Sequence, residues 1–479
     1  MSEFDGLTIA ALAERLRTKQ LSPVELAEAS IARAKATEPT LNSFITLTAD
    51  QAMAAARRAE AEITAGDYRG PMHGIPFVTK DLFWTKDVLT TSGSRADASF
   101  VPDEDSTVVR LLQDAGAFSI GKTNMSEWAF SITGYNTHFG WPNNPWALDR
   151  MPAGSSSGTG TSVTAGVAPM GLGTDTGGSI RAPASFCGLT GLKPTYGLVS
   201  RHGVTPLSWS LDHAGPLTHS AEDVALTMNV LAAHDPKDPY SARRAPIDFM
   251  QHLNDGVAGL RIGVAREYVW DVLDAEVEAS VREAIEELGR LGATIVEVSL
   301  PELEWASQMG GVLTVTESAA FHGERVLREG HLYDQRTRRR IESGLFISAA
   351  TYHQAQRVRT MVAMGLARVF GEVDLLATPT MPTTALAQEV ALTTTELNGR
   401  SYPTSNLMTR LTQVFNVNGH PALSAPCGFD HAGLPIGLQL VGRPFEDALV
   451  VQAAHAYQGT TDWHERRPSV YGARHGARE

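Results

Sequence analysis

The sequence AGSSSGTGTSVTAGVAPMGLGTDTGGSIR, residues 153–181, is the stretch around which the rest of the chain is organised. Glycine and hydroxyl residues dominate both of its ends, and glycine permits positive φ and close backbone approach. Such ends form poor helices and strands. A flexible Gly/Ser linker would lack the apolar run at 163–172. It would also not be followed by APASFCGLTGLKP, 182–194, an apolar segment with glycines and prolines at short intervals. We therefore interpret the stretch as a folded loop whose N–H groups converge on an anion or a developing oxyanion.

Bulk composition excludes several functional classes. The chain has 479 residues and a net charge of −13, so we expect no nucleic-acid partner. Its two cysteines, Cys187 and Cys427, lie in apolar surroundings, which favours a reducing compartment over a disulfide framework. The first 20 residues lack an apolar signal region, and no apolar run is long enough to cross a membrane. We expect a cytoplasmic protein with no membrane contact.

Helical and strand patterns alternate along the whole chain. Helices are expected at 7–20, 23–36, 50–64, 105–116, 276–291, 303–328, 336–370 and 448–458, and strands at 75–79, 118–121, 260–265, 294–300, 373–378, 421–429 and 436–442. No clear linker interrupts them, which favours one α/β domain over 1–479 around a central sheet. Within it, 1–66 is a helical segment, 70–202 carries the candidate catalytic motifs, and 203–479 supplies the remaining sheet and its covering helices.

A lysine, Lys80, closes the apolar strand at 75–79. Burying a charged amine is costly, so one interpretation is that the side chain snorkels to water or pairs with Asp81. The other is that the lysine has a functional role in the interior of the protein. The strand pattern alone leaves both open.

Several standard catalytic patterns are absent or incomplete. The glycines at 171, 173 and 177 miss the dinucleotide-binding fingerprint, and neither a phosphate-loop lysine nor a zinc-binding cluster occurs. We therefore expect no metal and no cofactor. The segment GSSSG, 154–158, matches the nucleophile elbow of Ser–His–Asp esterases. That elbow requires a preceding strand, and the proline-containing segment 144–153 is not one.

Aromatic residues crowd the loop-rich segment 128–146. Singly, each is best explained by core packing. As a group they could wall a pocket for an apolar substrate.

The chain resembles the amidase signature family of serine hydrolases. The matching segments are GIPFVTKD (74–81), GKTNMSE (121–127), AGSSSGTGTS (153–162), LGTDTGGSIRAPASFCGLTGLKPTYGLVSR (172–201) and GLPIGLQLVG (433–442). The resemblance covers nearly the whole chain. It implies a single α/β/α domain around a large mixed β-sheet covered by helices, and a Ser–cisSer–Lys triad in place of Ser–His–Asp.

The resemblance also implies roles for particular residues. The triad is Ser179 as nucleophile, Ser155 as cis-serine and Lys80 as general base. The oxyanion hole is formed by the N–H groups of Thr176, Gly177, Gly178 and Ser179. Supporting polar groups are Ser131, Ser156, Asp175 and Arg181, and the candidate substrate pocket contains Trp128, Ala129, Phe130 and Trp209. The loop departs from the family pattern at Ala153 and Ser157, where glycines are usual.

Elementary chemistry agrees with these roles. A serine hydroxyl needs a base to act as a nucleophile, and a lysine can serve only when neutral, so its pKa must fall from about 10.4. Burial at the end of an apolar strand lowers it. The Ser155 hydroxyl can then relay the proton, because it both accepts and donates.

Besides the Ser–His–Asp esterase that would use the GSSSG elbow, three functional classes remain. The favoured one is an amidase acting on small aryl or alkyl amides, anilides or carbamates, as a monomer or homodimer. The second is the glutaminase (A) component of a glutamyl-tRNA(Gln) amidotransferase complex, whose glutamine-binding region resembles AEASSNLARYDG. Here 316–323 reads TESAAFHG, so that pattern is absent. The third, a catalytically inactive binding module, is disfavoured because all triad positions are filled.

Overall fold

The computed structural model describes residues 6–469 and has a large sheet at its centre. Its strands are β1 (Phe44–Leu47), β2 (Pro76–Lys80), β3 (Phe118–Thr123), β4 (Met170–Asp175), β5 (Thr190–Lys193), β6 (His213–Thr218), β7 (Arg261–Ala265), β8 (Thr294–Val298), β9 (Leu375–Pro379), β12 (Ala422–Phe429) and β13 (Pro435–Gly442). They form an 11-stranded mixed sheet in the order β1-β3-β2-β4-β6-β5-β12-β13-β9-β7-β8. A separate hairpin pairs β10 (Thr394–Leu397) with β11 (Arg400–Pro403).

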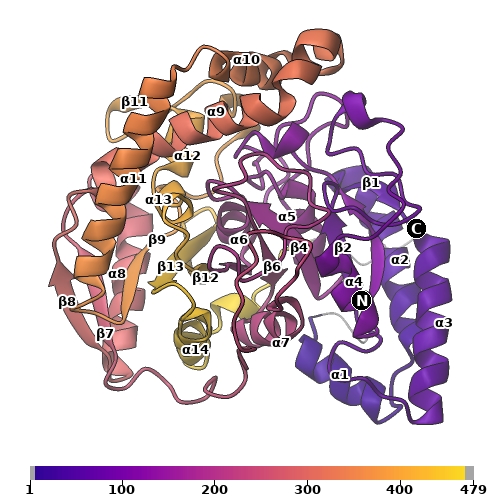
Figure 1. The fold of residues 1–479 in the computed structure, drawn as a ribbon. Helices are drawn as coiled ribbons and strands as arrows, with labels where there is room; N and C mark the ends of the chain where they lie inside the picture. The colour runs from indigo at the N-terminus through magenta and orange to yellow at the C-terminus, as the bar shows by residue number, and fades with distance from the viewer. Residues whose placement is uncertain (1–5, 470–479) are drawn as a thin grey trace, which may run out of the picture.

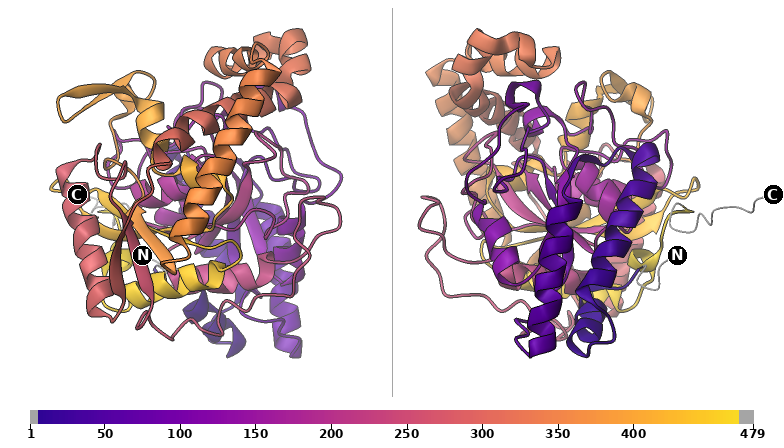
Figure 2. Two further views of the ribbon diagram at one scale, coloured as in Figure 1. Left: turned by 60° about the vertical axis from the view of Figure 1, so that its left-hand side comes forward. Right: turned by 90° about the vertical axis from the view of Figure 1, so that its right-hand side faces the viewer.

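Helices flank this sheet (Figure 1). They are α1 (Ile9–Arg17), α2 (Pro23–Leu41), α3 (Ala49–Ala65), α4 (Thr107–Asp114), α5 (Ser157–Thr164), α6 (Arg181–Cys187), α7 (Ala221–Leu231), α8 (Ala275–Arg290), α9 (Leu303–Glu329), α10 (Gln335–Gly344), α11 (Ala349–Val369), α12 (Thr404–Thr409), α13 (Gln413–Val417) and α14 (Asp447–Gln458). The long helices α2 and α3 pack side by side at one end of the molecule, and α9–α11 lie at the other (Figure 2). The mixed α/β fold is as expected from the sequence, and the segment 336–370, expected to be mainly helical, is divided into α10 and α11.

The N-terminal helices form where the sequence predicts them, with one difference. Ser22 accepts a hydrogen bond from the N–H of Val24, and Glu25 accepts one from the N–H of Ser22, which completes the capping box. The helix α2 continues past the expected end near residue 36 to Leu41, with Pro39 in its last turn. It does so because Leu41 is fully buried and the following Asn42 adopts the left-handed conformation that ends the helix.

The glycine-rich stretch 153–181 is not one loop, and that expectation is wrong. It contains the helix α5 and the central strand β4, which lies parallel to β2 and antiparallel to β6. Gly171 lies inside β4, where a Cβ would clash with Thr159 of α5 and Val78 of β2. The glycines therefore serve close packing between a helix and a strand as much as loop geometry.

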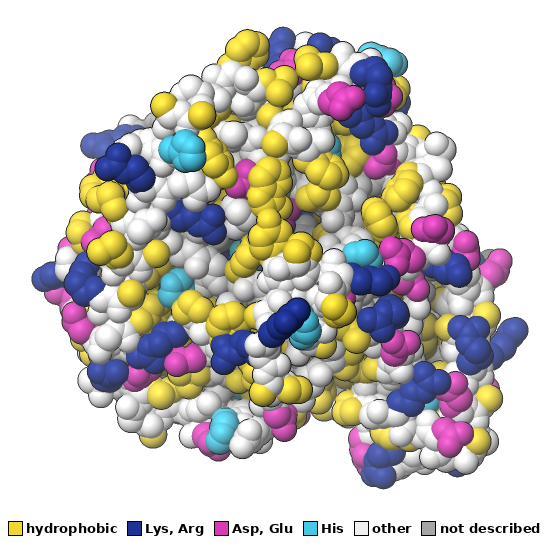
Figure 3. Space-filling view, viewed as in Figure 1, with side chains coloured by type: hydrophobic (Ala, Val, Ile, Leu, Met, Phe, Trp, Pro, Cys, Tyr) yellow, Lys and Arg dark blue, Asp and Glu magenta, His cyan; other side chains and the backbone are white. Residues whose placement is uncertain are grey.

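Charged side chains of both signs are interspersed on the face in Figure 3, which is the face seen in Figure 1. In the described part of the chain, no helix is long and apolar enough to cross a membrane. Both cysteines are buried and free.

Candidate active site

Lys80 is the last residue of β2, which lies between β3 and β4 in the sheet. Its side chain is completely buried. Its Nζ donates hydrogen bonds to Ser155 Oγ at 2.7 Å and to Thr174 Oγ1 at 2.8 Å. The lysine therefore neither snorkels to water nor pairs with the adjacent Asp81.

Burial lowers the pKa of Lys80 to about 7, and the charges of Asp175 and Asp212 only partly oppose that shift. The cause is desolvation, which penalises the ammonium form when no carboxylate contacts it directly. A large fraction of this amine is therefore neutral near pH 7. A neutral amine held against a serine hydroxyl has the properties of a general base.

Asp81 instead faces a second buried lysine, Lys122, at 3.9 Å. Lys122 donates hydrogen bonds to the carbonyl oxygen of Phe83 and to Thr90 Oγ1, and Asp81 accepts them from Thr91. Burial raises the pKa of Asp81 to about 6 and lowers that of Lys122 to about 8. This pair fixes the backbone immediately after Lys80.

Ser155 follows a cis peptide bond between Gly154 and itself. The preceding glycine lies against the backbone of Gly134, where a Cβ would come within 2.6 Å of the Gly134 nitrogen. The hydroxyl of Ser155 faces Lys80, whereas that of Ser156 hydrogen-bonds the carbonyl oxygen and N–H of Thr174. The two neighbouring serines therefore have different surroundings.

The turn between β4 and α6 carries Ser179 and is organised by an ion pair between Asp175 and Arg181. The two side chains are fully buried, with Arg181 Nη2 2.9 Å and Nε 3.0 Å from the carboxylate oxygens. Burial alone would raise the pKa of Asp175, but the charge and hydrogen bonds of Arg181 hold it well below its usual range. The bracing role predicted for these two residues matches this geometry.

The N–H of Gly178 donates a 2.7 Å hydrogen bond to Asp175 Oδ1. The N–H of Gly178 therefore already has an acceptor within the protein. The structure corrects the prediction that this N–H is one of the oxyanion-hole donors. Among residues 6–469, the N–H groups of Gly177 and Ser179 donate no backbone hydrogen bond outside helices and strands. These two donors, with Thr176, remain as candidates. Thr176 is further fixed by its hydroxyl, which donates to Asp212 at 2.5 Å.

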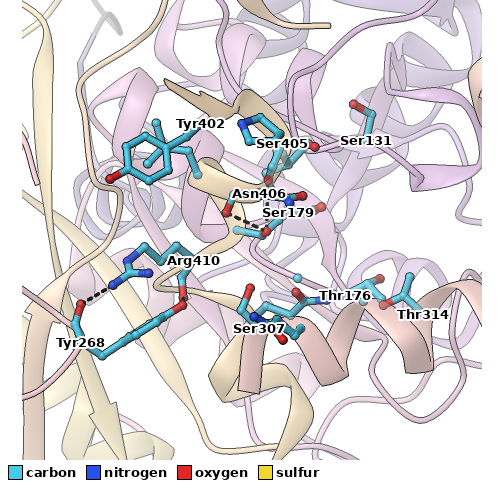
Figure 4. A pocket seen from close by; sticks show the side chains of 18 of the residues that line it. Ser131, Thr176, Ser179, Tyr268, Ser307, Thr314, Tyr402, Ser405, Asn406 and Arg410 are labelled. Carbon is cyan, nitrogen blue, oxygen red and sulfur yellow. Dashed lines mark hydrogen bonds between the residues drawn. The ribbon is translucent and has the colours of Figure 1, made fainter. Parts of the chain in front are cut away.

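A cavity of about 1100 Å³ opens at Ser179 (Figure 4). One wall comes from the predicted segments and contains Ala129, Phe130, Ser131, Thr176 and Gly177. The other walls come from the loop at 266–271, the helix α9 and the segment 402–413, for which the sequence predicted no role in the site. No motif in a single sequence marks these segments, because they reach the site only through the fold.

Two aromatic residues predicted for the pocket do not line it. Trp128 is buried and packs against His322, with ring centroids 4.5 Å apart, and against Tyr333 at 5.9 Å. The backbone carbonyl of Trp209 accepts hydrogen bonds from Tyr196 and Arg201. Phe130 and Ala129 do line the cavity, and Ser131 lies there bonded to Thr133.

Thr174 is the residue near the base that sequence reasoning missed. Its hydroxyl receives the second hydrogen bond of Lys80. The parallel pairing of β2 and β4 places it there, because Thr79 is in register with Leu172. Recognising β4 as the neighbour of β2 would have identified this residue.

Other chemistries find no support in the described residues. Ser156 is completely buried, does not line the cavity, and follows no strand, so the nucleophile-elbow geometry is not formed. Among residues 6–469, no group of three or more His, Cys, Asp or Glu side chains is arranged to hold a metal ion.

Comparison with known proteins shows the family of this chain. The Amidase family model matches residues 25–451. The A component of the glutamyl-tRNA(Gln) amidotransferase of Chloroflexus aggregans is 42% identical, covering 98% of this chain and 99% of that protein. The chain therefore belongs to the amidase family, whose members act as hydrolases on carbon–nitrogen bonds.

Solved structures with this fold include the following two. A chain from a vestigial protein complex that reveals the evolutionary origins of an s-triazine catabolic enzyme has a TM-score of 0.91 at 33% identity, covering 95% of this chain and 98% of that one. A bacterial aryl acylamidase of the amidase signature family has a TM-score of 0.90 at 27% identity, covering 99% and 100%.

The pH dependence of kcat/KM tests Lys80. Because only the neutral amine can accept a proton, kcat/KM should rise with pH through about 7 and level off above it. Lys80→Ala should lose most amidase activity, with esters less affected because they have better leaving groups. Lys80→Arg should not restore activity, since a guanidinium stays charged. Near-native amide turnover by Lys80→Arg would contradict the assignment.

Two glycine variants test the turn that carries Ser179. Gly178 has φ of +127°, and a Cβ there would overlap Thr412 Oγ1, whereas a Cβ on Gly177 would meet Gln413 at an ordinary 3.7 Å. Gly178→Ala should displace the neighbouring N–H donors and lower kcat by about 10²–10³, as for a lost oxyanion donor. Gly177→Ala is the matched control and should lose far less. Equal, small losses measured in folded proteins would place the oxyanion hole elsewhere.

Proposed function

We propose that this chain hydrolyses small amides through an acyl-enzyme formed on Ser179. The observation that carries the proposal is the buried amine of Lys80, 2.7 Å from Ser155 Oγ, with its pKa lowered to about 7 beside a cavity that Ser179 lines. The arrangement provides what a serine nucleophile requires, namely a base and access to substrate.

In the proposed reaction, Ser179 Oγ attacks the carbonyl carbon while its proton passes to Ser155 Oγ and the proton of Ser155 passes to Lys80 Nζ. The N–H groups of Thr176, Gly177 and Ser179 stabilise the developing oxyanion. Collapse of this intermediate breaks the C–N bond, and the proton returns along the same path to the departing amine. Water then attacks the ester with Lys80 again accepting a proton, which frees the acid and Ser179.

The substrate in this proposal is a small-molecule amide, anilide or carbamate, hydrolysed in the cytoplasm by a monomer or homodimer. The cavity of about 1100 Å³ is large for a small acyl group. Phe130 supplies an aromatic surface beside Ser131 in its wall. Both features favour a substrate larger than a simple aliphatic amide.

A second candidate function is the glutaminase component of a tRNA-dependent amidotransferase. The relatives favour it more strongly than the residues of the chain alone do, because a protein of that name is 42% identical over nearly the full length of both chains. Against it stands the segment 316–323 of α9, which lacks the expected pattern. There, Glu317 accepts hydrogen bonds from Ser208 and Ser210.

An activity-based probe tests the nucleophile. A fluorophosphonate should label Ser179, since this residue lines the cavity and in the proposed reaction passes its proton through Ser155 to Lys80, and Ser179→Ala should abolish both labelling and turnover. Ser156→Ala, whose hydroxyl only bonds the Thr174 backbone, should still be labelled. Peptide mass spectrometry that finds the adduct on Ser156 would revive the elbow mechanism.

A substrate panel distinguishes the two candidate functions. The purified chain alone should hydrolyse several amides, anilides or carbamates and should turn over glutamine at least tenfold more slowly than the best of them. The measurement is kcat/KM for each compound, with and without added partner proteins and tRNA. Glutamine as the best substrate, with turnover only in a complex, would establish the amidotransferase function instead.

A further inference from the structure

Arg410 lines the cavity without a carboxylate partner. It follows the helix α12 and is partly buried, with its Nε atom shielded from solvent and unpartnered. Within residues 6–469, no Asp or Glu oxygen lies within ion-pair distance of its guanidinium. Shielding part of a guanidinium from water without a counter-charge costs free energy, and a ligand that supplies the charge would offset that cost.

The guanidinium of Arg410 is held in place from one side only. Its carbon lies 3.6 Å from the centre of the Tyr268 ring, and its Nη2 donates to the Tyr268 carbonyl oxygen at 2.8 Å. In return, the Tyr268 hydroxyl donates to the Arg410 carbonyl oxygen at 3.2 Å. Tyr268 itself has φ of +69°, an uncommon conformation for an aromatic residue. The guanidinium is thus fixed in orientation, yet most of its N–H donors remain without a partner among the described residues.

The segment bearing Arg410 touches the nucleophile turn directly. Thr412, two residues further on, donates a 2.7 Å hydrogen bond to the carbonyl oxygen of Gly177. The carbonyl oxygen of Thr412 in turn accepts from Arg181 Nη1 at 2.9 Å. Ser179 and Arg410 therefore lie in the same cavity, as Figure 4 shows, on two segments whose separation is fixed by these bonds.

The other charged side chains of the cavity differ from Arg410 in their partners or in their position. Arg266 lies 3.5 Å from Glu297 and 4.0 Å from Glu267. Two carboxylates, those of Asp271 and Glu304, are exposed at the cavity surface.

Arg340 is the cavity cation most like Arg410. It stacks on the Phe130 ring at 4.0 Å and donates to the Phe130 carbonyl oxygen, and desolvation of its guanidinium lowers its pKa to about 10. However, it lies on α10, away from the segment that bonds the nucleophile turn. Of the two, only Arg410 lies on the segment whose hydrogen bonds reach the residues around Ser179.

We propose that Arg410 binds a carboxylate of the substrate, so that the enzyme acts on amides that carry a second, anionic end. The fork of N–H donors in a guanidinium matches the two oxygens of a carboxylate. The amide carbonyl lies at Ser179 and the carboxylate at Arg410. This inference rests on the proposed function and narrows its substrate class to monoamides of dicarboxylic acids with a net charge of −1, which excludes glutamine because its amino group cancels the charge of its carboxylate.

Paired substrates test the inference. Straight-chain dicarboxylic acid monoamides of about two to six methylenes are each compared with the neutral amide in which a methyl group replaces the carboxylate. In the wild-type enzyme, kcat/KM should favour the carboxylated member of the best pair at least tenfold, and added salt should reduce this preference. Arg410→Gln should lower the ratio within the pair by about 10- to 100-fold, as for lost hydrogen bonds to a charged group. Arg410→Lys should retain part of it.

The matched control is Arg266→Gln, which removes a cation from the same cavity that already has carboxylate partners. It should leave the ratio unchanged. If Arg410 only supported Tyr268, Arg410→Gln would slow both members of each pair equally, and the inference would be wrong. Loss of the preference in Arg340→Gln rather than in Arg410→Gln would also overturn it.

The two proposals fail in different ways. Hydrolysis of neutral amides without any preference for carboxylated ones would overturn the carboxylate site and leave the amidase function standing. Absence of hydrolysis of every compound, together with no fluorophosphonate labelling of Ser179, would overturn the proposed function. As a direct binding measurement, glutarate should inhibit hydrolysis of a neutral amide competitively in the wild type, and at least tenfold more weakly in Arg410→Gln.

Discussion

The buried ion pair between Asp175 and Arg181 is the interaction on which the site depends. Besides Asp175, Arg181 reaches Gln439 on β13 at 2.7 Å and Asn416 on α13 at 2.7 Å, so it joins the centre of the sheet to the C-terminal half of the chain. A buried ion pair offsets the free energy of desolvating its two charges only when its remaining N–H donors are also hydrogen-bonded. In Arg181, Nε, Nη1 and Nη2 all donate hydrogen bonds. The same carboxylate takes the N–H of Gly178, which shapes the turn that presents Ser179.

Burial is the second constraint, and it acts on three lysines with different outcomes. Lys80, Lys122 and Lys193 are all completely buried, and burial lowers the pKa of each. Lys122 faces the carboxylate of Asp81, whereas Lys80 has only two hydroxyl groups as partners. A lysine surrounded by hydroxyls loses its proton more readily than one beside an anion. Between Lys80 and Lys122, the local partner therefore decides which amine suits a base.

Close backbone packing explains why glycine recurs around the site. A Cβ on Gly158 would overlap the carbonyl oxygen of Ser43 and the backbone of Asn124, and one on Gly154 would meet Gly134. The start of α5 is thus pressed against neighbouring segments, and Ser155 is held between them. Packing at this density transmits small displacements to the reacting groups. The glycine-rich composition, which in the sequence indicates a loop, is therefore largely required for close contact between helices, strands and the segments beside them.

The sequence by itself determined most of the helices and strands, because period and capping are local signals: the capping box at Ser22 and the amphipathic pattern of α8 both form as expected. It also identified Lys80 as an anomaly at the end of an apolar strand. Only the tertiary structure decided what surrounds that lysine, because Thr174 reaches it through the pairing of β2 with β4. The tertiary structure likewise decided that the N–H of Gly178 donates to Asp175 and that the segment of Arg410 lies against the turn that carries Ser179. Each depends on contacts between segments far apart in the chain, which no local pattern encodes.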